Sequence, residues 1–357
     1  MLNRDLNMII FLGLFFLMLP FPSKCFGPTG HFIVARIAEL ELQNHKDFPQ
    51  MMGVLGLLSP YTKETNHPFE EAAVWADDIK YLRWSSMNKW HFDNVYINND
   101  NNKLRVIPKD EYLSMGLIND PSDIVQAINN AKSNLRNIRK SLVDDRMGKS
   151  INLRLLIHLI GDIHQPLHSC TLVNSQFPKG DSGGNKFIID MPGARNLHSY
   201  WDRMLKKYST LKTPLTESHF EKLDNMVNSI ISQFSRSYGN LPKRLSTTSV
   251  RAWANESVKI CLEYVYNGIS PGEEPSIEYI ERGKLIIDEQ LAVAGYRLAD
   301  TIKSIFEIDN VFGDHTKENL LKKIETDTGK ILKTNKNNLN IMLIGINILF
   351  FNFFIFK

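Results

Sequence analysis

Histidine and aspartate side chains recur at helix spacing in two segments of the sequence. His158 and Asp162 are four residues apart in an apolar stretch, and His198 and Asp202 repeat that spacing within Leu-His-Ser-Tyr-Trp-Asp. Residues four apart on a helix project from one face, so each pair presents a nitrogen and an oxygen donor together. Such donors are common zinc ligands, and His168 adds another nitrogen close by in the sequence. The spacing is therefore compatible with a metal site.

Three other potential ligands lie upstream of these pairs, at His31, Asp77 and His91. A carboxylate has two oxygens and can bridge two ions, so a mixed set of histidines and aspartates favours several metals that act on a phosphate ester. Each position also has a simpler interpretation. A lone His–Asp pair is more often a salt bridge within a helix, Asp77 could cap a turn, and His91 could pack between its aromatic neighbours. Spacing alone leaves both interpretations open.

The residues around these donors have the periodicity of helices. Apolar residues recur at helical spacing over residues 30–44, 70–80, 123–145, 151–163, 218–238, 249–266 and 281–306. Residues 186–189 follow two glycines and are predicted to form a short strand, and the Asn-rich stretch 98–103 is predicted to be a surface loop. We therefore expect one mostly α-helical domain with at most a short β-hairpin.

The composition allows a large core, because 43% of the 357 residues are hydrophobic and 23% are charged. It excludes a wholly disordered or collagen-like chain. The net charge of +3 does not by itself indicate a nucleic-acid partner, which would need a local basic site. Cys25, Cys170 and Cys261 are the cysteines. If the first leaves with a signal peptide, the other two could form one disulfide, but their proximity does not follow from the sequence. Asn255 begins a formal glycosylation sequon within a helical pattern.

Both ends of the sequence have the pattern of targeting segments. An early Arg4, an apolar run over residues 8–21 and small residues before Phe26 predict a signal peptide over residues 1–25, with an uncleaved signal anchor as the alternative. We expect a polar linker over residues 307–340, followed by the almost wholly apolar tail 341–357. The tail fits a lipid-anchor signal or a membrane helix. These features predict a protein of the secretory pathway, either secreted or tethered to a membrane and facing the lumen or the outside.

The motifs around the donors resemble those of the zinc-dependent S1/P1 nuclease family, whose fold is similar to that of bacterial zinc phospholipase C. The most specific part is His-Leu-Ile-Gly-Asp-Ile-His-Gln-Pro-Leu-His from His158 to His168, followed by Gly183-Gly184-Asn185 and the segment from Leu197 to Asp202. Weaker motifs begin at Phe26, Trp75, Trp253 and Ala294. The resemblance implies a single domain over residues 26–306 with the phospholipase C/P1 nuclease-like helical fold.

The resemblance also implies three zinc ions and their ligands. One zinc would be held by Asp77, His91, His158 and Asp162. A second would be held by His168, His198 and Asp202. The third would use His31, Asp162 as a bridge, and the backbone amine and carbonyl of the mature first residue. That residue is usually Trp in the family and is Phe26 here, so the assignment requires signal cleavage immediately before it.

By resemblance, the protein is an endonuclease that hydrolyses single-stranded DNA and RNA to 5′-phosphate products and also removes 3′-phosphates from nucleotides. The family often has Arg three residues after its first aspartate ligand, for phosphate contact. Lys80 stands there, which keeps the charge but loses the planar fork. Past the second ligand the family has Asp or Asn facing the attacking water, a role for which Asp93 and Asn94 compete. Asn185 is expected to bind nucleotide or phosphate.

Two other functions stay open at this point. A phospholipase C would share the three-zinc arrangement, but the acidic and aromatic cage that choline recognition needs is not evident in the sequence. A non-catalytic metal-binding surface protein would keep the same core. The complete ligand set argues against it, because an enzyme that has lost its activity is expected to lose open-site ligands first. No protein partner is evident, and we expect a monomer that contacts the membrane through its C-terminal tail.

Overall fold

The computed structural model describes residues 26–81, 85–100, 103–118, 122–137 and 146–334. The predicted signal peptide over residues 1–25 and the apolar tail over residues 341–357 lie outside them. The chain forms two compact units, Met1–Ile305 and Phe306–Lys357. Among the described residues, no helix combines the length and the apolar character needed to cross a membrane.

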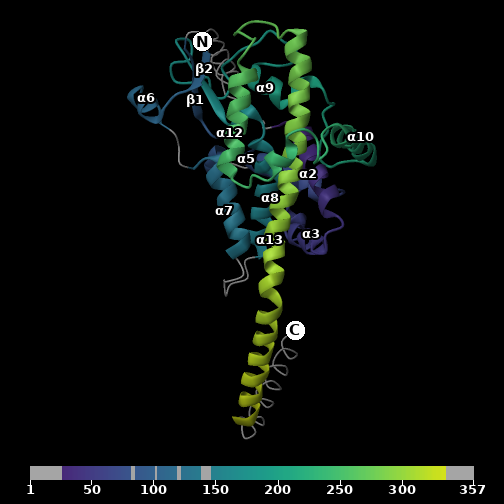
Figure 1. Cartoon of the computed structure of the whole chain (residues 1–357). Helices are drawn as coiled ribbons and strands as arrows, with labels where there is room; N and C mark the ends of the chain where they lie inside the picture. Colours follow the sequence, from purple (N-terminus) through teal and green to yellow (C-terminus); the bar gives the residue numbers. More distant parts are fainter. Residues whose placement is uncertain (1–25, 82–84, 101–102, 119–121, 138–145, 335–357) are drawn as a thin grey trace, which may run out of the picture. The chain divides into compact units, whose positions relative to one another are not determined.

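The first unit is mostly helical, as the sequence predicts, and carries one small sheet (Figure 1). In chain order, its helices and strands are α2 (Pro28–Leu42), α3 (Phe48–Gly56), η1 (Ser59–Tyr61), α4 (Pro68–Glu71), η2 (Ala72–Val74), α5 (Trp75–Tyr81), η3 (Ser85–His91), β1 (Val95–Asp100), β2 (Lys103–Val106), α6 (Lys109–Ser114), α7 (Ile124–Asn137), α8 (Arg146–Asp162), η5 (Pro166–His168), β3 (Cys170–Val173), α9 (Leu197–Asp202), η6 (Met204–Lys206), α10 (Glu217–Gln233), α11 (Leu241–Leu245), α12 (Val250–Ile260), η7 (Cys261–Val265) and the start of α13 (Ile277–Thr334).

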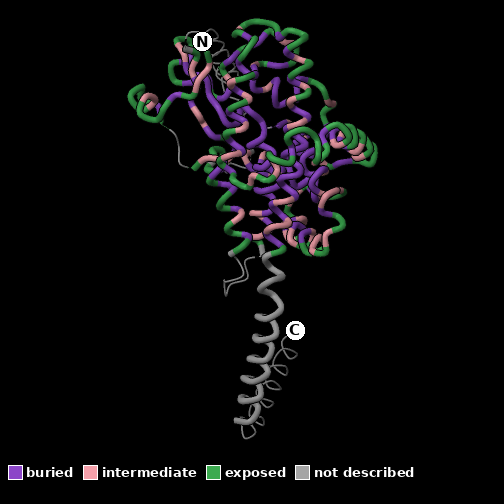
Figure 2. Tube along the Cα trace, in the orientation of Figure 1, coloured by how far each residue is buried: buried purple, intermediate pink, exposed green. Residues whose placement is uncertain are grey.

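Helix α8 is the central element of the core. Every side chain from Leu153 to Asp162 is buried, and the helix packs against α2, α3, α5 and α7. Figure 2 shows this buried centre surrounded by segments with exposed residues. A helix stretch that is buried on all sides must be enclosed by other elements, and its polar residues must find partners inside the protein. Shortly after α8, Gln165 adopts the extended backbone that a following proline favours, and Pro166 begins the next short helix.

Helix α10 shows the contrasting surface pattern. Thr216 caps its first turn by accepting a hydrogen bond from the amide of His219. Leu223, Val227 and Ile230 are buried at spacings of four and three residues, so one face of α10 packs inward, against α2. The helix predicted over residues 218–238 is therefore confirmed, with an earlier end at Gln233.

The sheet has the strand order β2-β1-β3. Strands β1 and β2 form an antiparallel hairpin, and β3 adds to β1 in parallel, with Val95 opposite Cys170. The expected hairpin is thus present but extended by a third strand. Residues 98–103 were predicted to be a loop, yet residues 98–100 complete β1 and Lys103 begins β2. The Asn-rich composition did not prevent pairing: residues 98–100 pair with residues 103–105 of β2, and residues 95–98 are also held by β3.

Two other local predictions need correction. Residues 186–189 form no strand, because their amides bond back into the preceding loop: Lys186 N donates to Asp181 O and Phe187 N to Gly184 O. The helix predicted over residues 249–266 is divided, with α12 ending at Ile260 and the wider π-helical turn η7 following it. Cys261, in η7, forms a disulfide with Cys170 on β3, so the two cysteines that the sequence left unassigned are paired.

Candidate metal centre

The histidines and aspartates singled out in the sequence come from six parts of the fold and meet in its interior. His31 lies on α2, Asp77 on α5, His91 at the end of η3, and His168 in η5. Helix α8 supplies His158 and Asp162, and α9 supplies His198 and Asp202. Seven of these eight side chains are buried, with exposed fractions of 4% or less, and Asp77 is intermediate. The fold therefore gathers them as the metal interpretation requires.

The Asp162 carboxylate lies among the histidines. Its Oδ1 is 3.2 Å from His31 Nε2, whereas its Oδ2 is 2.9 Å from His91 Nδ1 and 3.1 Å from His158 Nε2. Oδ1 also lies 3.9 Å from His168 Nδ1. Each oxygen thus faces a different set of nitrogens. This is the arrangement expected of a carboxylate that bridges two ions.

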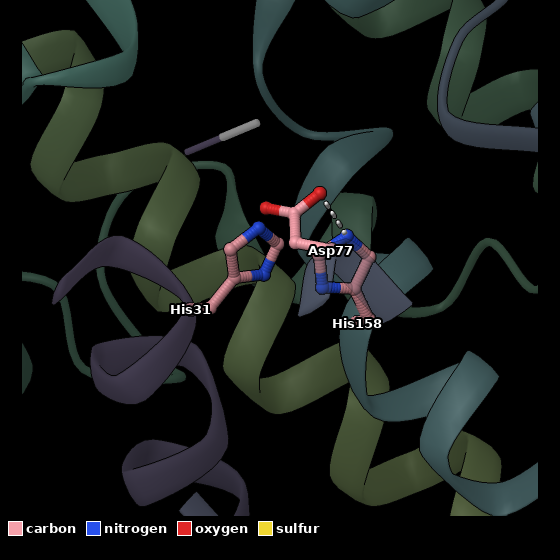
Figure 3. Close-up of side chains that lie close together, drawn as sticks. All are labelled: His31, Asp77 and His158. Carbon is pink, nitrogen blue, oxygen red and sulfur yellow. Dashed lines mark ion pairs between the residues drawn. The ribbon is translucent and has the colours of Figure 1, made fainter. Parts of the chain in front are cut away.

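Asp77 completes the group on the side of α5. Figure 3 shows its carboxylate beside the rings of His31 and His158, which come from separate helices. Asp77 Oδ1 is 3.7 Å from His158 Nε2, and the rings of His31 and His158 stack with centroids 4.0 Å apart. These three residues each offer a ligand atom within 4.8 Å of the others, as do His91, His158 and Asp162.

A separate group consists of His168, His198 and Asp202, whose ligand atoms also lie within 4.8 Å of one another. Asp202 places one oxygen 3.7 Å from His168 Nε2 and the other 3.3 Å from His198 Nε2. Gln165 donates from Nε2 to Asp202 Oδ1 at 2.8 Å, which holds the carboxylate in this orientation. The four-residue spacing on α9 therefore does present both donors to one point.

The parallel pairing of β1 and β3 explains how distant segments reach this site. Parallel strands begin at the same edge of a sheet, so the residues before Val95 and before Cys170 are neighbours. Accordingly, Asp93 N donates to His168 O at 2.7 Å, and His168 Nδ1 donates to His91 O at 2.7 Å. The sheet thereby joins the end of η3 to η5.

Backbone carbonyls determine which nitrogen each ring directs at the centre. His158 Nδ1 donates to Ala73 O, and His198 Nδ1 donates to Gly183 O at 2.6 Å. With His168 bonded in the same way, three rings turn Nε2 toward the centre; Nε2 of His168 and His198 makes no hydrogen bond, whereas His158 Nε2 lies 3.1 Å from His91 Nδ1. Ligand histidines in metalloproteins are oriented by such outer hydrogen bonds.

The inner atoms of the site lack hydrogen-bond partners. Both ring nitrogens of His31, Oδ1 of Asp162, and Nε2 of His168 and His198 are buried and make no hydrogen bond. His31 Nε2 lies within ion-pair distance of Asp162 Oδ1 but not in hydrogen-bond geometry. Each unsatisfied buried polar group costs about 1–3 kcal/mol. Several orphaned donors that converge on common points fit divalent cations well.

The pKa values of these groups follow from burial and from the carboxylates. Burial lowers the pKa of His31 and of His198, and it lowers the pKa of His91 to about 4. Burial acts on His158 in the same direction, but Asp162 and Asp77 outweigh it and raise the pKa of that ring. The neighbouring histidines hold the pKa of Asp162 well below its ordinary value although burial opposes this. His168 resembles His158, because Asp202 and Asp162 raise the pKa of its ring against the effect of burial. The lowered pKa values of His31, His91 and His198 favour the unprotonated imidazole, and that of Asp162 favours the carboxylate, which are the forms that bind metals.

An open cleft of about 350 Å³ gives access to these donors from solvent. Its lining consists of Lys80, Asn88, His91, Phe92, Asn94, Tyr96, Leu167, His168, Thr171, Lys179, Ser182, Gly183, Asn185 and His198. Three of the predicted substrate-contacting residues, Lys80, Asn94 and Asn185, are among them. Asp93 is not: it is buried and its carboxylate pairs with Arg251. Within the described residues, Asn94 is thus better placed than Asp93 to face a reacting group.

The N-terminal end of the described chain is packed beside the site. Phe26 is fully buried, and Gly27 N donates to Asp202 O at 2.7 Å. This contact places the first residue of the expected mature chain next to a proposed ligand. The position is consistent with a ligand role for Phe26.

Comparison with known proteins agrees with the geometry. Residues 26–307 match the family described as S1/P1 Nuclease. The chain belongs to the S1/P1 nuclease family. Endonuclease 3 of Arabidopsis thaliana is 26% identical over 294 residues, which cover 80% of this chain and 90% of the relative. Endonuclease 1 of the same plant is 27% identical over 317 residues, covering 85% and 94%. Nuclease S1 of Aspergillus oryzae is 26% identical over 295 residues, covering 76% and 89%.

As an S1/P1 nuclease, the protein is a hydrolase of phosphodiester bonds, and both the expected family and the expected enzyme class are confirmed. Some residues that shape its site were not singled out from the sequence. A Cβ atom on Gly161 would lie 2.9 Å from His31 Nδ1, so glycine is required for the close approach of α2 and α8. Gln165, which holds Asp202, was likewise quoted only within a motif. The sequence signal that could have identified Gly161 and Gln165 is their position between the proposed ligands His158 and His168.

Proposed function

We propose that this S1/P1 nuclease is a zinc enzyme that cleaves single-stranded DNA and RNA and leaves 5′-phosphate and 3′-hydroxyl ends, with 3′-nucleotidase activity as well. The observation that carries the proposal is the convergence of eight histidine and aspartate side chains, several with orphaned buried atoms, beneath one open cleft. Nitrogen and carboxylate donors of this kind suit zinc better than magnesium or calcium.

In this assignment, Asp77, His91, His158 and Asp162 hold one zinc ion, and His168, His198 and Asp202 hold a second. His31, Asp162 and the backbone of Phe26 hold the third. Bound zinc would acidify a water molecule and neutralise charge on the phosphate. The chain's own task is to keep the donors deprotonated, oriented by backbone carbonyls and enclosed on all sides except the cleft.

The lining of the cleft supplies groups suited to a nucleotide. Lys80 donates to Asp77 Oδ1 at 2.7 Å and also lines the cleft, so its ammonium group can meet a phosphate beside the ligand carboxylate. Asn94 and Asn185 add amide groups that can hydrogen-bond the attacking water and the substrate. Phe92 is 36% exposed and offers a face on which an unpaired base can stack. Paired bases are unavailable for such stacking, which favours single strands.

The decisive experiment measures zinc and activity on the same preparation of purified mature protein. We expect about three zinc ions per chain by elemental analysis, and release of acid-soluble nucleotides from denatured DNA that a chelator abolishes. Analysis of the products should find 5′-phosphate ends. A protein that contains no zinc, or that hydrolyses denatured DNA equally well in a chelator, would contradict the proposal.

Two other outcomes distinguish the alternatives. Release of headgroup from phosphatidylcholine without nucleotide release would support a phospholipase C. Zinc content without either activity would support a non-catalytic metal-binding protein. The nuclease relatives and the neutral or cationic lining residues beside the ligands favour the first proposal.

The proposed cellular route rests on the sequence and on the disulfide. A Cys170–Cys261 bond suits an oxidising compartment, and both cysteines are fully buried. We propose that the protein enters the secretory pathway, loses residues 1–25, and is secreted or tethered through residues 341–357 as a monomer. Mass spectrometry of the mature chain tests this directly, since its first residue should be Phe26.

A further inference from the structure

Asp181 is a fully buried carboxylate outside the proposed ligand set. Among the described residues it has no ion-pair partner. Its Oδ2 accepts a hydrogen bond from the Tyr266 hydroxyl at 2.7 Å, and its Oδ1 accepts from Leu172 N at 2.9 Å and from Thr171 Oγ1 at 3.1 Å. A buried carboxylate is costly unless its bonds are complete. These bonds also hold neighbouring groups in place.

The Thr171 hydroxyl links Asp181 to the loop that follows it. Thr171 Oγ1 accepts from Ser182 N at 3.1 Å and from Gly183 N at 3.3 Å. A hydroxyl has one proton, so with two amides pointing at its oxygen the proton must be donated to Asp181. The carboxylate thus fixes the orientation of the hydroxyl, and the hydroxyl fixes two successive amides.

The loop needs such support because its backbone is unusual. Gly180, Ser182, Gly183 and Gly184 all have positive φ angles, between 61° and 85°. Ser182 has no glycine flexibility, so its conformation must be imposed by its surroundings. A Cβ atom on Gly183 would lie 2.5 Å from Leu167 O, which shows how closely the loop approaches η5.

The loop in turn contacts His198 of the proposed metal centre, where Gly184 O accepts from the backbone amide of His198 at 3.3 Å. Gly183 O accepts the hydrogen bond from His198 Nδ1 at 2.6 Å. That bond places the proton on Nδ1 and turns Nε2 toward Asp202, 3.3 Å away. A continuous chain of hydrogen bonds therefore runs from Asp181 through Thr171 and Gly183 to His198.

We propose that Asp181 is a positioning residue that acts through Thr171 to set the carbonyl of Gly183, and thereby orients His198 for the zinc shared by His168, His198 and Asp202. This inference rests on the proposed zinc function. Asp181 contacts neither the ligands nor the cleft, so its effect is selective: one of the three zinc sites depends on it and the other two do not.

The elements that hold Asp181 and Thr171 are joined to one another. When a hydrogen bond of the series from Asp181 to His198 is lost, we therefore expect the loop to shift and these elements to stay in place. Thr171 lies on β3 opposite Tyr96 of β1, and the preceding Cys170 is bonded to Cys261. Tyr266 directly follows η7, the turn that contains Cys261. Asp181 is thus held by β3 and by the residue after η7, two elements that the disulfide joins.

The test compares two substitutions at Thr171 in the mature protein. Thr171→Val keeps the size and shape of the side chain but removes the hydroxyl, whereas Thr171→Ser retains it. Zinc retention is measured by dialysis against zinc buffers of known free concentration. We expect Thr171→Val to lose one ion, with its affinity reduced by about 10- to 100-fold, and the other two ions to stay bound. Thr171→Ser should match the wild type.

Tyr266→Phe provides a control for simple loss of stability. It removes the other hydrogen bond to Asp181 but leaves Thr171 bonded to the loop, so we expect a lower Tm with zinc affinity within about two-fold of the wild type. If Tyr266→Phe and Thr171→Val weaken zinc binding equally, the network is merely structural and the inference is wrong. If Thr171→Val does not fold, Asp181→Ala, which removes the acceptor of the Thr171 hydroxyl, must show the same selective loss of one ion.

The outcomes separate this inference from the proposed function. A wild-type protein without zinc overturns the proposed function, and this inference with it. A wild-type protein with three zinc ions, together with Thr171→Val that holds all three at unchanged affinity, overturns this inference alone.

Discussion

Asp162 is the residue on which the proposed centre depends most. Its two oxygens lie within 3.2 Å of nitrogens on three separate histidines. The pKa of this carboxyl is held well below its ordinary value, chiefly by His158 against the opposing effect of burial. No other described residue of the centre makes as many such contacts, so a change here should affect more than one ion.

Asp162→Asn should therefore remove at least one zinc ion and reduce nuclease activity by about 1,000-fold or more, because an amide cannot bridge two cations. Zinc content and hydrolysis of denatured DNA are the measurements. His164→Ala is the matched control, two residues away. His164 donates to Ile160 O and accepts from Arg297, so its loss should lower stability and leave zinc content unchanged. Full activity and unchanged zinc in Asp162→Asn would refute the ligand assignment.

Lys80 should act on substrate rather than on metal. Its ammonium group contacts Asp77 but also lines the cleft. We expect Lys80→Ala to raise KM for single-stranded DNA by about 10-fold while zinc content stays the same. Lys80→Arg should recover most of the affinity, since it restores a bidentate phosphate contact. A large loss of zinc in Lys80→Ala would instead mean that Lys80 mainly supports Asp77.

Much of the site at the residue scale could be predicted from the sequence, because spacing and motif identify donors. The eight side chains do converge. What spacing could not predict is the direction of each ring, since this depends on carbonyls such as Ala73 O and Gly183 O that lie far away in the sequence. It also could not separate Asp93 from Asn94, a choice that follows from the contact of Asp93 with Arg251.

At the scale of elements, α8 holds the centre through a buried ion pair one turn before His158. Arg154 Nε donates to Glu64 Oε1 at 2.7 Å, and the same guanidinium bonds to Leu55 O and Ser150. Both members of the pair are buried. The pair connects α8 to the segment that leads into α4, and so to the helices that position Asp77.

Breaking this pair should be strongly destabilising. Glu64→Gln leaves the buried guanidinium without its counter-charge, so we expect the free energy of unfolding to fall by about 3–5 kcal/mol. Denaturant titration at neutral pH measures this. Lys63→Gln, at the exposed neighbouring position, should change stability by less than about 0.5 kcal/mol. A loss below about 1 kcal/mol in Glu64→Gln would show that the pair contributes little.

A second buried carboxyl makes the packing of α2 and α4 depend on pH. Burial, and then the neighbouring Glu39, raise the pKa of Glu70 well above its ordinary value. A raised pKa means that the folded state favours the protonated form, so this stabilising contribution is present at low pH and is lost as pH rises through the folded-state pKa. Glu70→Gln imitates the protonated form. Its Tm should therefore exceed that of the wild type at pH 8 and match it more closely at pH 5; the opposite order would exclude this explanation.

Elements were predicted well where periodicity is local and poorly where pairing is distant. The ligand-bearing helices α2, α5 and α8 lie in ranges predicted from apolar spacing, whereas α9 was indicated only by the four-residue spacing of His198 and Asp202. The parallel addition of β3 to β1 joins residues about 75 positions apart in the sequence, such as Val95 and Cys170, which no local pattern reveals. Residues 186–189 have the apolar run of a short strand after two glycines, yet no neighbouring strand is available to pair with them among the described residues.

At the scale of the whole molecule, the proposed metal centre draws on elements from across the first unit. Its donors come from α2, α5, η3, α8, η5 and α9, and among them are the orphaned buried atoms described above. Zinc would satisfy these atoms and link the elements at the same time. Metal binding to the folded state alone stabilises it by mass action.

Removal of zinc should consequently destabilise the whole domain. At a free zinc concentration of about 100 times Kd, each bound ion adds about 2.7 kcal/mol to the free energy of unfolding. A chelator should therefore lower Tm. Calorimetry with and without chelator, followed by readdition of zinc, gives the measurement. Magnesium at the same concentration is the control and should restore little. An unchanged Tm after complete zinc removal would argue against these donors as ligands.

The burial of the Cys170–Cys261 bond has a practical consequence. Neither sulfur is accessible to solvent, so a dissolved thiol can attack the bond only after this part of the chain has opened. The time needed for a reductant to cleave it therefore reports how often the region beside His168 opens. The rate of reduction, followed by alkylation of the freed thiols and mass measurement, therefore gives the rate of local opening near the cleft without any added label.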